Sequence, residues 1–208
     1  MFLKNTIENL KKKIFKDDLI INLGSKNVYI GKRGSNSFIC EASLLAIEHH
    51  ENYKSIIAVG NDAYDLIGRK NENIKIISPF KDGKIENKIM ASHLLKMIIN
   101  KHFEDSFFKL PFQVLNIIPT DITLSEKEMR EDLFLSLGSR KVNYINSILS
   151  NGIGMQADIG NEKALMICDI GSDTSQCGII KLNNIVTEKL FNFGVDSINN
   201  AIIKMLRE

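Results

Sequence analysis

Two short segments carry side chains that could bind a phosphate and a metal ion. They are Asn22-Leu23-Gly24-Ser25 and Asp169-Ile170-Gly171-Ser172, and each ends an apolar run typical of a buried strand. In both, a Gly-Ser turn leads into a second apolar run. Backbone N–H groups in such turns bind phosphate oxygens, and a carboxylate at the strand end can hold a magnesium-bound water. The repeat therefore predicts a duplicated fold with two turns converging on one polyphosphate, although Gly-Ser hairpins also occur in proteins that bind nothing.

Apolar periodicity and turn residues predict the elements that position these turns. Strands are expected at residues 19–23, 28–31, 38–40, 43–47, 55–59, 74–77, 114–118, 142–145, 164–170, 176–180 and 185–193. Helices are expected at 61–69 with Asn61 as cap, 87–103 with Asn87 as cap, 125–137 with a Ser125/Glu128 capping box, and from 196 onward. The strands before residue 60 read as one antiparallel meander, whereas strands and helices alternate after residue 110. This pattern predicts a mixed α/β architecture.

Composition limits the classes of function. The chain has 208 residues, of which 44% are hydrophobic and 25% charged, as in ordinary globular proteins. A formal net charge of +2 is too small to predict a nucleic-acid partner. The three cysteines, at positions 40, 168 and 177, fit neither a zinc site nor a redox pair, so they are expected to be buried free thiols in a reducing cytoplasm.

Residues 1–16 have the pattern of a basic amphipathic helix. The apolar stripe is formed by Phe2, Leu3, Ile7, Leu10 and Ile14. The basic face includes Lys11, Lys12 and Lys13. Such a helix can lie on an anionic membrane surface, or it can pack on its own domain or on another chain. No run of about 18 apolar residues and no signal peptide are found, so the expected location is the cytoplasm, at most peripheral at the inner face of the membrane.

Several motifs, in order along residues 18–206, resemble the MreB-like bacterial actins. Asn22-Leu23-Gly24-Ser25 is similar to the family's first phosphate hairpin, Asp-Leu-Gly-Thr, and Asp169 to Thr174 is similar to its second, Asp-Ile-Gly-Gly-Gly-Thr. The most specific match is residues 76–85, which are similar to the family's Pro-x-x-Asp-Gly-x-Ile signature. Residues 118–130 resemble its Val-Pro-x-x-Ile-Thr loop and helix, and Gly194-Val195-Asp196 resembles its Gly-Gly-Asp.

The resemblance implies an α/β actin-like fold, a duplicated RNase H-like ATPase architecture whose first half is complete and whose second half is partial. It implies a domain I at 18–157 with a small subdomain at about 34–81, the beginning of a domain II at 158–208, and residues 1–17 as the N-terminal helix. ATP and Mg²⁺ are the implied cofactors, and self-association or other actin-like subunits are the implied partners. The implied nucleotide-binding residues, with Asp169 as the metal ligand, are Asn22, Gly24, Ser25, Lys26, Asn27, Asp169, Gly171, Ser172, Asp173, Thr174 and Gly194.

The departures from the family pattern fall on the chemistry. Asn22 replaces an aspartate that helps to organise magnesium, and a neutral amide is a weaker ligand for that ion than a carboxylate. Ser172 and Asp173 replace two glycines, so a Cβ and a negative charge stand beside the phosphate path. Asn146-Ser147-Ile148 replaces a Glu-Glu-Pro stretch whose glutamate positions the attacking water. We therefore expect weak or vestigial nucleotide binding and poor hydrolysis.

The chain also lacks the family's adenine-contacting segments. It is expected to be a fragment of a longer gene product, a chain completed by another chain, or the product of a decaying gene, and the sequence leaves these three open. Besides a membrane-associated cytoskeletal protein, two other functions fit the superfamily. One is a working ATPase or kinase-like enzyme, and the other is a binding module of the chaperone-like or plasmid-segregation type.

Overall fold

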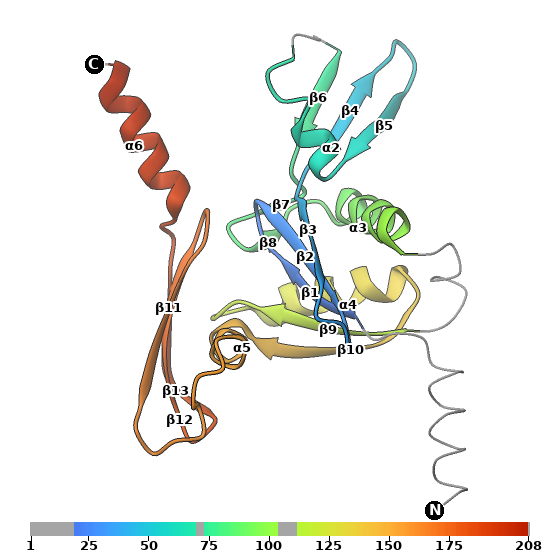
Figure 1. Cartoon of the computed structure of the whole chain (residues 1–208). Helices are drawn as coiled ribbons and strands as arrows, with labels where there is room; N and C mark the ends of the chain where they lie inside the picture. The colour runs from blue at the N-terminus through green and yellow to red at the C-terminus, as the bar shows by residue number, and fades with distance from the viewer. Residues whose placement is uncertain (1–18, 70–72, 104–111, 208) are drawn as a thin grey trace, which may run out of the picture.

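The computed structural model describes residues 19–69, 73–103 and 112–207. The predicted N-terminal helix, including its membrane-facing residues, lies outside them. Within the described part no helix is both long and apolar enough to cross a membrane. The chain builds two mixed α/β bodies and a small additional sheet; in Figure 1 the small sheet stands above the larger body, and the second body stands to its left.

The larger body is a five-stranded sheet covered by two helices. Its strand order is β10-β9-β1-β2-β3, with β1 antiparallel to β2 and parallel to β9. The elements are β1 (Leu19–Leu23), β2 (Asn27–Lys32), β3 (Phe38–Ala42), β9 (Phe112–Ile118), β10 (Ser139–Asn146), α3 (Lys88–His102) and α4 (Leu124–Ser136). Leu19 and Ile21 of β1 are fully buried in the same core as Leu94 of α3 and Phe134 of α4. This core fixes the end of β1, where the first Gly-Ser turn begins.

A separate small sheet replaces the continuous meander expected from the sequence. Its order is β5-β4-β6, from β4 (Leu45–His49), β5 (Lys54–Val59) and β6 (Ile74–Ile77), and α2 (Asn61–Tyr64) packs beside it. The prediction of one meander was wrong because Ser43 ends the pairing with β2: its backbone N–H binds Lys26 O at 2.8 Å and its hydroxyl binds Gly24 O at 2.6 Å. The chain then leaves the large sheet. A two-stranded hairpin, β7 (Phe80–Lys81) and β8 (Lys84–Ile85), leads into α3.

The second body is a three-stranded antiparallel sheet with order β11-β12-β13. It comprises β11 (Leu165–Ile170), β12 (Ser175–Lys181), β13 (Asn184–Phe191), α5 (Ser147–Gly154) and α6 (Val195–Arg207). Ile148 of α5 packs against Ile167 and Ile180 in a small core of its own. A Cβ on Gly178 would approach the Ile148 side chain to 2.8 Å, so this glycine allows the close contact between helix and sheet.

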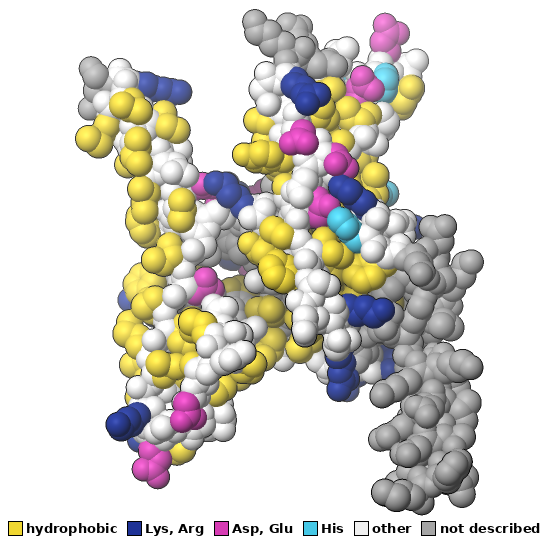
Figure 2. Space-filling view, viewed as in Figure 1, with side chains coloured by type: hydrophobic (Ala, Val, Ile, Leu, Met, Phe, Trp, Pro, Cys, Tyr) yellow, Lys and Arg dark blue, Asp and Glu magenta, His cyan; other side chains and the backbone are white. Residues whose placement is uncertain are grey.

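Helix α6 buries none of its described side chains. Exposed apolar residues on it are Val195, Ile198, Ile202, Ile203, Met205 and Leu206. Figure 2 shows hydrophobic side chains running along α6 and onto the sheet below it. An apolar stripe of this size is typical of a surface that another element or chain covers.

Several local predictions are confirmed and others need correction. Asn87 caps α3 as expected, its side chain accepting a hydrogen bond from Met90 N at 3.0 Å. The capping box of α4 is formed by Thr123 and Glu126, not by Ser125 and Glu128. Asn61 is not the cap of α2, because Gly60 takes that position.

The short helix α2 and the cysteines also differ from expectation. α2 spans four residues, ending at Tyr64 and not at residue 69. Helix α5 was not expected at all. The cysteines are not buried: Cys40 and Cys168 are exposed and Cys177 is half-buried. The prediction failed because Cys168 lies on the outward face of β11, which nothing described covers.

Candidate nucleotide site

The two Gly-Ser turns close in the same way. Gly24 N donates to Asn27 O at 3.1 Å, and Gly171 N donates to Thr174 O at 3.0 Å. A Cβ on Gly24 or Gly171 would come within 2.7 or 2.8 Å of that same carbonyl oxygen, so each turn requires glycine at its first position. The repeat seen in the sequence is therefore a repeat of backbone geometry.

The second turn is held from behind by the start of α6. Val195 N donates to Gly171 O at 3.0 Å, and Asp196 N donates to Ser172 O at 2.9 Å. A Cβ on Gly194 would lie 2.2 Å from Ser172 O, so only glycine allows this approach. Gly194 thus supports the turn.

Both turns line one pocket of about 440 Å³ between the two bodies. Ten of the eleven residues predicted for nucleotide binding lie in its wall: Asn22, Gly24, Ser25, Lys26, Asn27, Asp169, Gly171, Ser172, Asp173 and Thr174. Gly194 is outside the wall and its neighbour Val195 is inside it. The pocket also includes Gly83, Pro119, Ser147 and Gln176, which were not among the predicted nucleotide-binding residues.

Side chains cross the pocket from one body to the other. Asp173 Oδ2 accepts a hydrogen bond from Asp82 N, in the turn between β7 and β8, at 3.1 Å. Lys26 of the first turn forms an ion pair with Asp196 at the start of α6. Both partners of this pair are partly exposed, so it contributes little stability by itself. Together the two contacts join the turn regions directly.

Asp169, the predicted metal ligand, belongs to a network of side-chain hydrogen bonds. Gln176 Nε2 donates to Asp169 Oδ2 at 2.8 Å, and Gln176 Oε1 accepts from Thr120 N at 3.1 Å. Thr120 Oγ1 in turn donates to Glu188 Oε2 at 3.0 Å, and Asn146 Nδ2 donates to the same oxygen at 2.7 Å. This hydrogen-bond network links β9 and β10 to β11–β13 and fixes one oxygen of Asp169.

In the segment that replaces the water-positioning glutamate, the side chain of Asn146 holds other parts of the fold. Asn146 caps α5 by accepting a hydrogen bond from Ile148 N at 2.8 Å, besides its contact with Glu188. Ser147 follows it, and its buried Oγ has no hydrogen-bond partner among the described residues. Buried hydroxyls without partners are rare, so this atom marks a point in the pocket wall where a water or a ligand oxygen can bind.

Arg130 of α4 positions the turn that contacts Asp173. The side chain is almost completely buried, and it donates to Gly83 O at 2.6 Å and to Asn116 Oδ1 at 3.4 Å. Asn116 in turn donates to Ile21 O of β1 at 2.9 Å. Burial lowers the pKa of Arg130 to about 10, which leaves it charged at neutral pH. The β7–β8 turn is therefore anchored to the strand that carries the first Gly-Ser turn.

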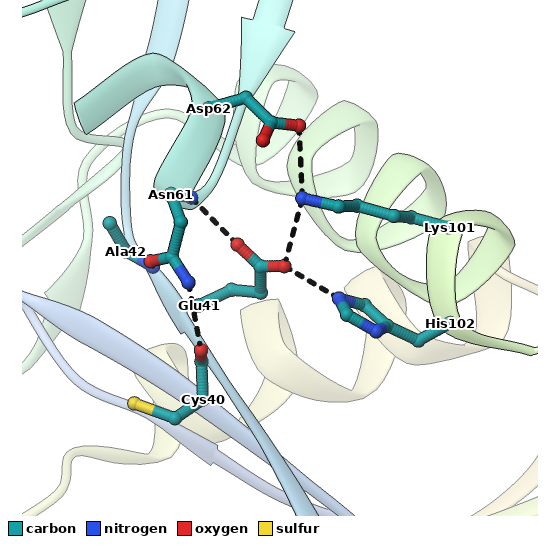
Figure 3. Close-up of polar contacts among 7 residues, drawn as sticks. All are labelled: Cys40, Glu41, Ala42, Asn61, Asp62, Lys101 and His102. Atoms are coloured by element: carbon teal, nitrogen blue, oxygen red, sulfur yellow. Dashed lines mark hydrogen bonds and ion pairs between the residues drawn. The ribbon is translucent and has the colours of Figure 1, made fainter. Parts of the chain in front are cut away.

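A second charged cluster lies away from the pocket, and Figure 3 shows it around Glu41. The Glu41 carboxylate, 2% exposed, accepts from Asn61 N at 2.6 Å and lies 2.5 Å from His102 Nε2 and 3.1 Å from Lys101 Nζ. Lys101 also contacts Asp62 at 2.9 Å. These contacts tie β3 and α2 to the end of α3, so the cluster fastens the small sheet to the larger body.

Comparison with known proteins places this geometry in a family. The family described as MreB/Mbl protein matches residues 16–208. The cell shape-determining protein MreB of Escherichia coli strain K12 is 31% identical over 196 residues, covering 93% of this chain and 56% of that protein. The cell shape-determining protein Mbl of Bacillus subtilis strain 168 is 29% identical over 194 residues, covering 93% of this chain and 57% of that protein.

Solved structures agree with the sequence matches. The crystal structure of MreB5 of Spiroplasma citri bound to ADP superimposes with a TM-score of 0.82 at 26% identity, covering 92% of this chain and 56% of that one. The crystal structure of the same protein bound to AMPPNP superimposes with a TM-score of 0.81 at 25% identity. The chain spans about half the length of the relatives it matches. Its sequence matches and its paired turns show that this chain belongs to the MreB/Mbl family of bacterial actins.

Proposed function

We propose that this chain is an MreB-like cytoskeletal protein of the cell-shape class whose nucleotide site binds weakly. One observation carries the proposal: two matched backbone turns face one pocket, but Asn22 and Asp173 stand in it where the family pattern has aspartate and glycine. Residues 18–157, with the small subdomain at about 34–81, form domain I in this proposal, and residues 158–208 begin domain II. The protein acts in the cytoplasm and not on nucleic acid.

The residues present do not fit tight binding of Mg²⁺ and a nucleoside triphosphate. The backbone of both turns suits phosphate, and the Spiroplasma citri relatives are described as bound to ADP and AMPPNP. The charged side chains in the pocket wall, however, are two carboxylates, Asp169 and Asp173, and one ammonium, Lys26, which already pairs with Asp196. Asn22 adds no charge to hold the cation. A polyphosphate therefore meets net negative charge at the second turn.

Hydrolysis is expected to be poor for a separate reason. Positioning and activating the attacking water calls for a suitably placed polar or basic group, and Asn146 is committed to capping α5 and to Glu188. The test is ATP turnover by the purified chain, compared with Asp169→Ala. Turnover clearly above background that disappears in the variant would contradict the proposal.

A working ATPase completed by another segment or another chain is the alternative. It is favoured by Asp169, which is retained, and by the unpartnered Oγ of Ser147 in the pocket wall. In that case Ser147→Ala would reduce turnover. In a vestigial site Ser147→Ala leaves nucleotide binding and turnover unchanged. Because it removes a buried hydroxyl without a partner, it leaves the stability of the fold unchanged or raises it.

We also propose that residues 1–17 bring the protein to an anionic membrane surface, through Phe2, Leu3, Ile7, Leu10 and Ile14 and the lysines 11–13. Leu10→Glu places a charge on the apolar stripe and is expected to release the full chain from anionic vesicles in a flotation assay. The matched control is Asn5→Glu, which adds the same charge off that stripe. Equal flotation of both variants and the wild type would refute the membrane proposal.

Association with further actin-like subunits, of this chain or another, completes the proposal. It is supported by the uncovered apolar residues of α6, among them Ile202 and Leu206. Substituting both with serine is expected to shift the purified chain toward smaller species in analytical ultracentrifugation. Identical sedimentation of wild type and variant at all concentrations would exclude α6 as the contact.

A further inference from the structure

Two of the three cysteines face each other across a pair of strands. Cys168 of β11 and Cys177 of β12 are directly opposite in the antiparallel register, and their sulfur atoms lie 3.0 Å apart. Opposite residues in such a pair have Cα atoms about 4.5 or 5.5 Å apart, and both values lie within the range of about 4.4–6.8 Å found in disulfides. The backbone therefore needs little or no movement to bring the sulfurs within bonding distance.

The pair is accessible and lies beside the candidate site. Cys168 is exposed and Cys177 half-buried, on the face of the sheet turned away from α5. The next residue after Cys168 is Asp169, and the second Gly-Ser turn lies between the two cysteines along the chain. Lys189 of β13 is opposite Cys177 in register, so a positive charge is carried on the same face of the sheet.

We propose that Cys168 and Cys177 form a thiol oxidation site, in which hydrogen peroxide converts them to an intrachain disulfide that staples the base of the second turn. The Cys168 thiolate attacks one peroxide oxygen, the O–O bond breaks, and Cys168 becomes a sulfenic acid while hydroxide leaves. The Cys177 sulfur then attacks the sulfenic sulfur, the S–O bond breaks, and water leaves with the Cys177 proton. Two thiols and one peroxide thus yield one disulfide and two waters.

The direction of attack follows from the exposure of the two thiols. Cys168 is exposed and Cys177 is half-buried, so a peroxide arriving from solvent reaches Cys168 first. The hydrogen bond between the two thiols raises the pKa of the Cys177 thiol. Cys177 is accordingly the resolving thiol and Cys168 the one oxidised first.

The test is hydrogen peroxide treatment of the purified chain, followed by alkylation of free thiols and peptide mass spectrometry. We expect a peptide pair linked through Cys168 and Cys177, reversible by a thiol reductant, in the wild type and in Cys40→Ser. Cys40 is the matched control because it is exposed but has no cysteine opposite it in register. In Cys177→Ser, Cys168 is expected to reach the sulfinic or sulfonic state.

Two results would overturn the proposal. One is sulfinic acid at Cys168 of the wild type with Cys177 still alkylated, and the other is disulfides formed only between chains. Hydrogen exchange gives a further measurement on the wild type itself. Amide exchange at residues 171–174 is expected to slow on oxidation, and exchange that is the same in both redox states would refute the stapling of the turn.

Discussion

The prediction that examines the site most closely is removal of the Asp173 charge. A phosphate seated on the backbone of the 171–174 turn would lie about 4 Å from this carboxylate, where the repulsion is about 4 kcal/mol at an effective dielectric of 20. That value is an upper limit, because Asp173 is only half-buried and can turn away from the ligand. Its hydrogen bond with Asp82 N, worth about 1 kcal/mol, is lost in Asp173→Gly and opposes the gain there, whereas the amide oxygen in Asp173→Asn can still accept it.

A net gain of about 1–2 kcal/mol remains, which is a factor of about 5–30 in affinity. Asp173→Gly restores the residue of the family pattern, and Asp173→Asn removes the charge while keeping the shape. The assay is calorimetric titration of each purified chain with Mg²⁺-ATP at low and at high salt. Both variants should bind more tightly than the wild type at low salt, and the difference should shrink at high salt, where charges are screened.

The controls separate charge from backbone freedom. Asp158→Asn removes one negative charge outside the pocket wall and should leave the affinity unchanged. If Asp173→Gly binds more tightly but Asp173→Asn does not, the turn needs glycine flexibility and the electrostatic argument fails. If neither variant gains affinity, the view of Asp173 as the obstacle to phosphate is refuted.

Three further predictions concern two buried charged side chains that hold the fold together, Glu41 and Arg130. Glu41→Ala should lower the free energy of unfolding by about 1.5–3 kcal/mol in urea denaturation, because it removes the buried carboxylate that contacts Asn61 N, Lys101 and His102, whereas exposed Glu51→Ala should change it by less than about 0.5 kcal/mol. Burial raises the pKa of Glu41, but hydrogen bonds from Asn61, His102 and Lys101 outweigh burial and hold that pKa below 4.5 in the folded chain. The stability that Glu41 contributes is therefore complete above pH 4.5 and is lost as the pH falls through the folded-state pKa. The wild type should accordingly lose stability more steeply in acid than Glu41→Ala. Arg130→Met should destabilise the chain by about 1–3 kcal/mol and speed amide exchange at Asp82, because Gly83 O loses its donor; unchanged exchange there would contradict the anchoring role.

The sequence predicts the elements around the turns well, for local reasons. β1 and β11 are short apolar runs ended by Gly-Ser, and α3 has both a helical period and a capping Asn87. The capping box of α4 was misplaced because Thr123/Glu126 and Ser125/Glu128 both fit the same spacing. The positive φ of Asp121 ends the preceding turn in time for Thr123 to be the cap, and this is not visible in the sequence.

What the sequence could not predict depends on contacts between distant segments. Helix α5 is eight residues long with two glycines, and it is stable because Ile148 packs under β11 and β12. The partners of Asp169 and Asp173 likewise come from far along the chain: Gln176 extends the Asp169 network to Thr120, and Asp82 meets Asp173. Residue types identified the turns, whereas only the fold shows which side chains occupy the space between them.

The two Gly-Ser turns face each other across one pocket, and a cross-link tests this arrangement most directly. Lys26 and Asp196, which pair across the pocket, are replaced by cysteines in a chain whose native cysteines are serines. The matched control pairs Lys26→Cys with Leu182→Cys, which follows the far end of β12, about 20 Å along the strand from the turn. Because the lysine side chain spans much of the distance, we predict rapid intrachain cross-linking of the first chain by a short bifunctional thiol reagent, and none in the control. Failure of the first pair to cross-link, or equal cross-linking of both pairs, would contradict the shared site.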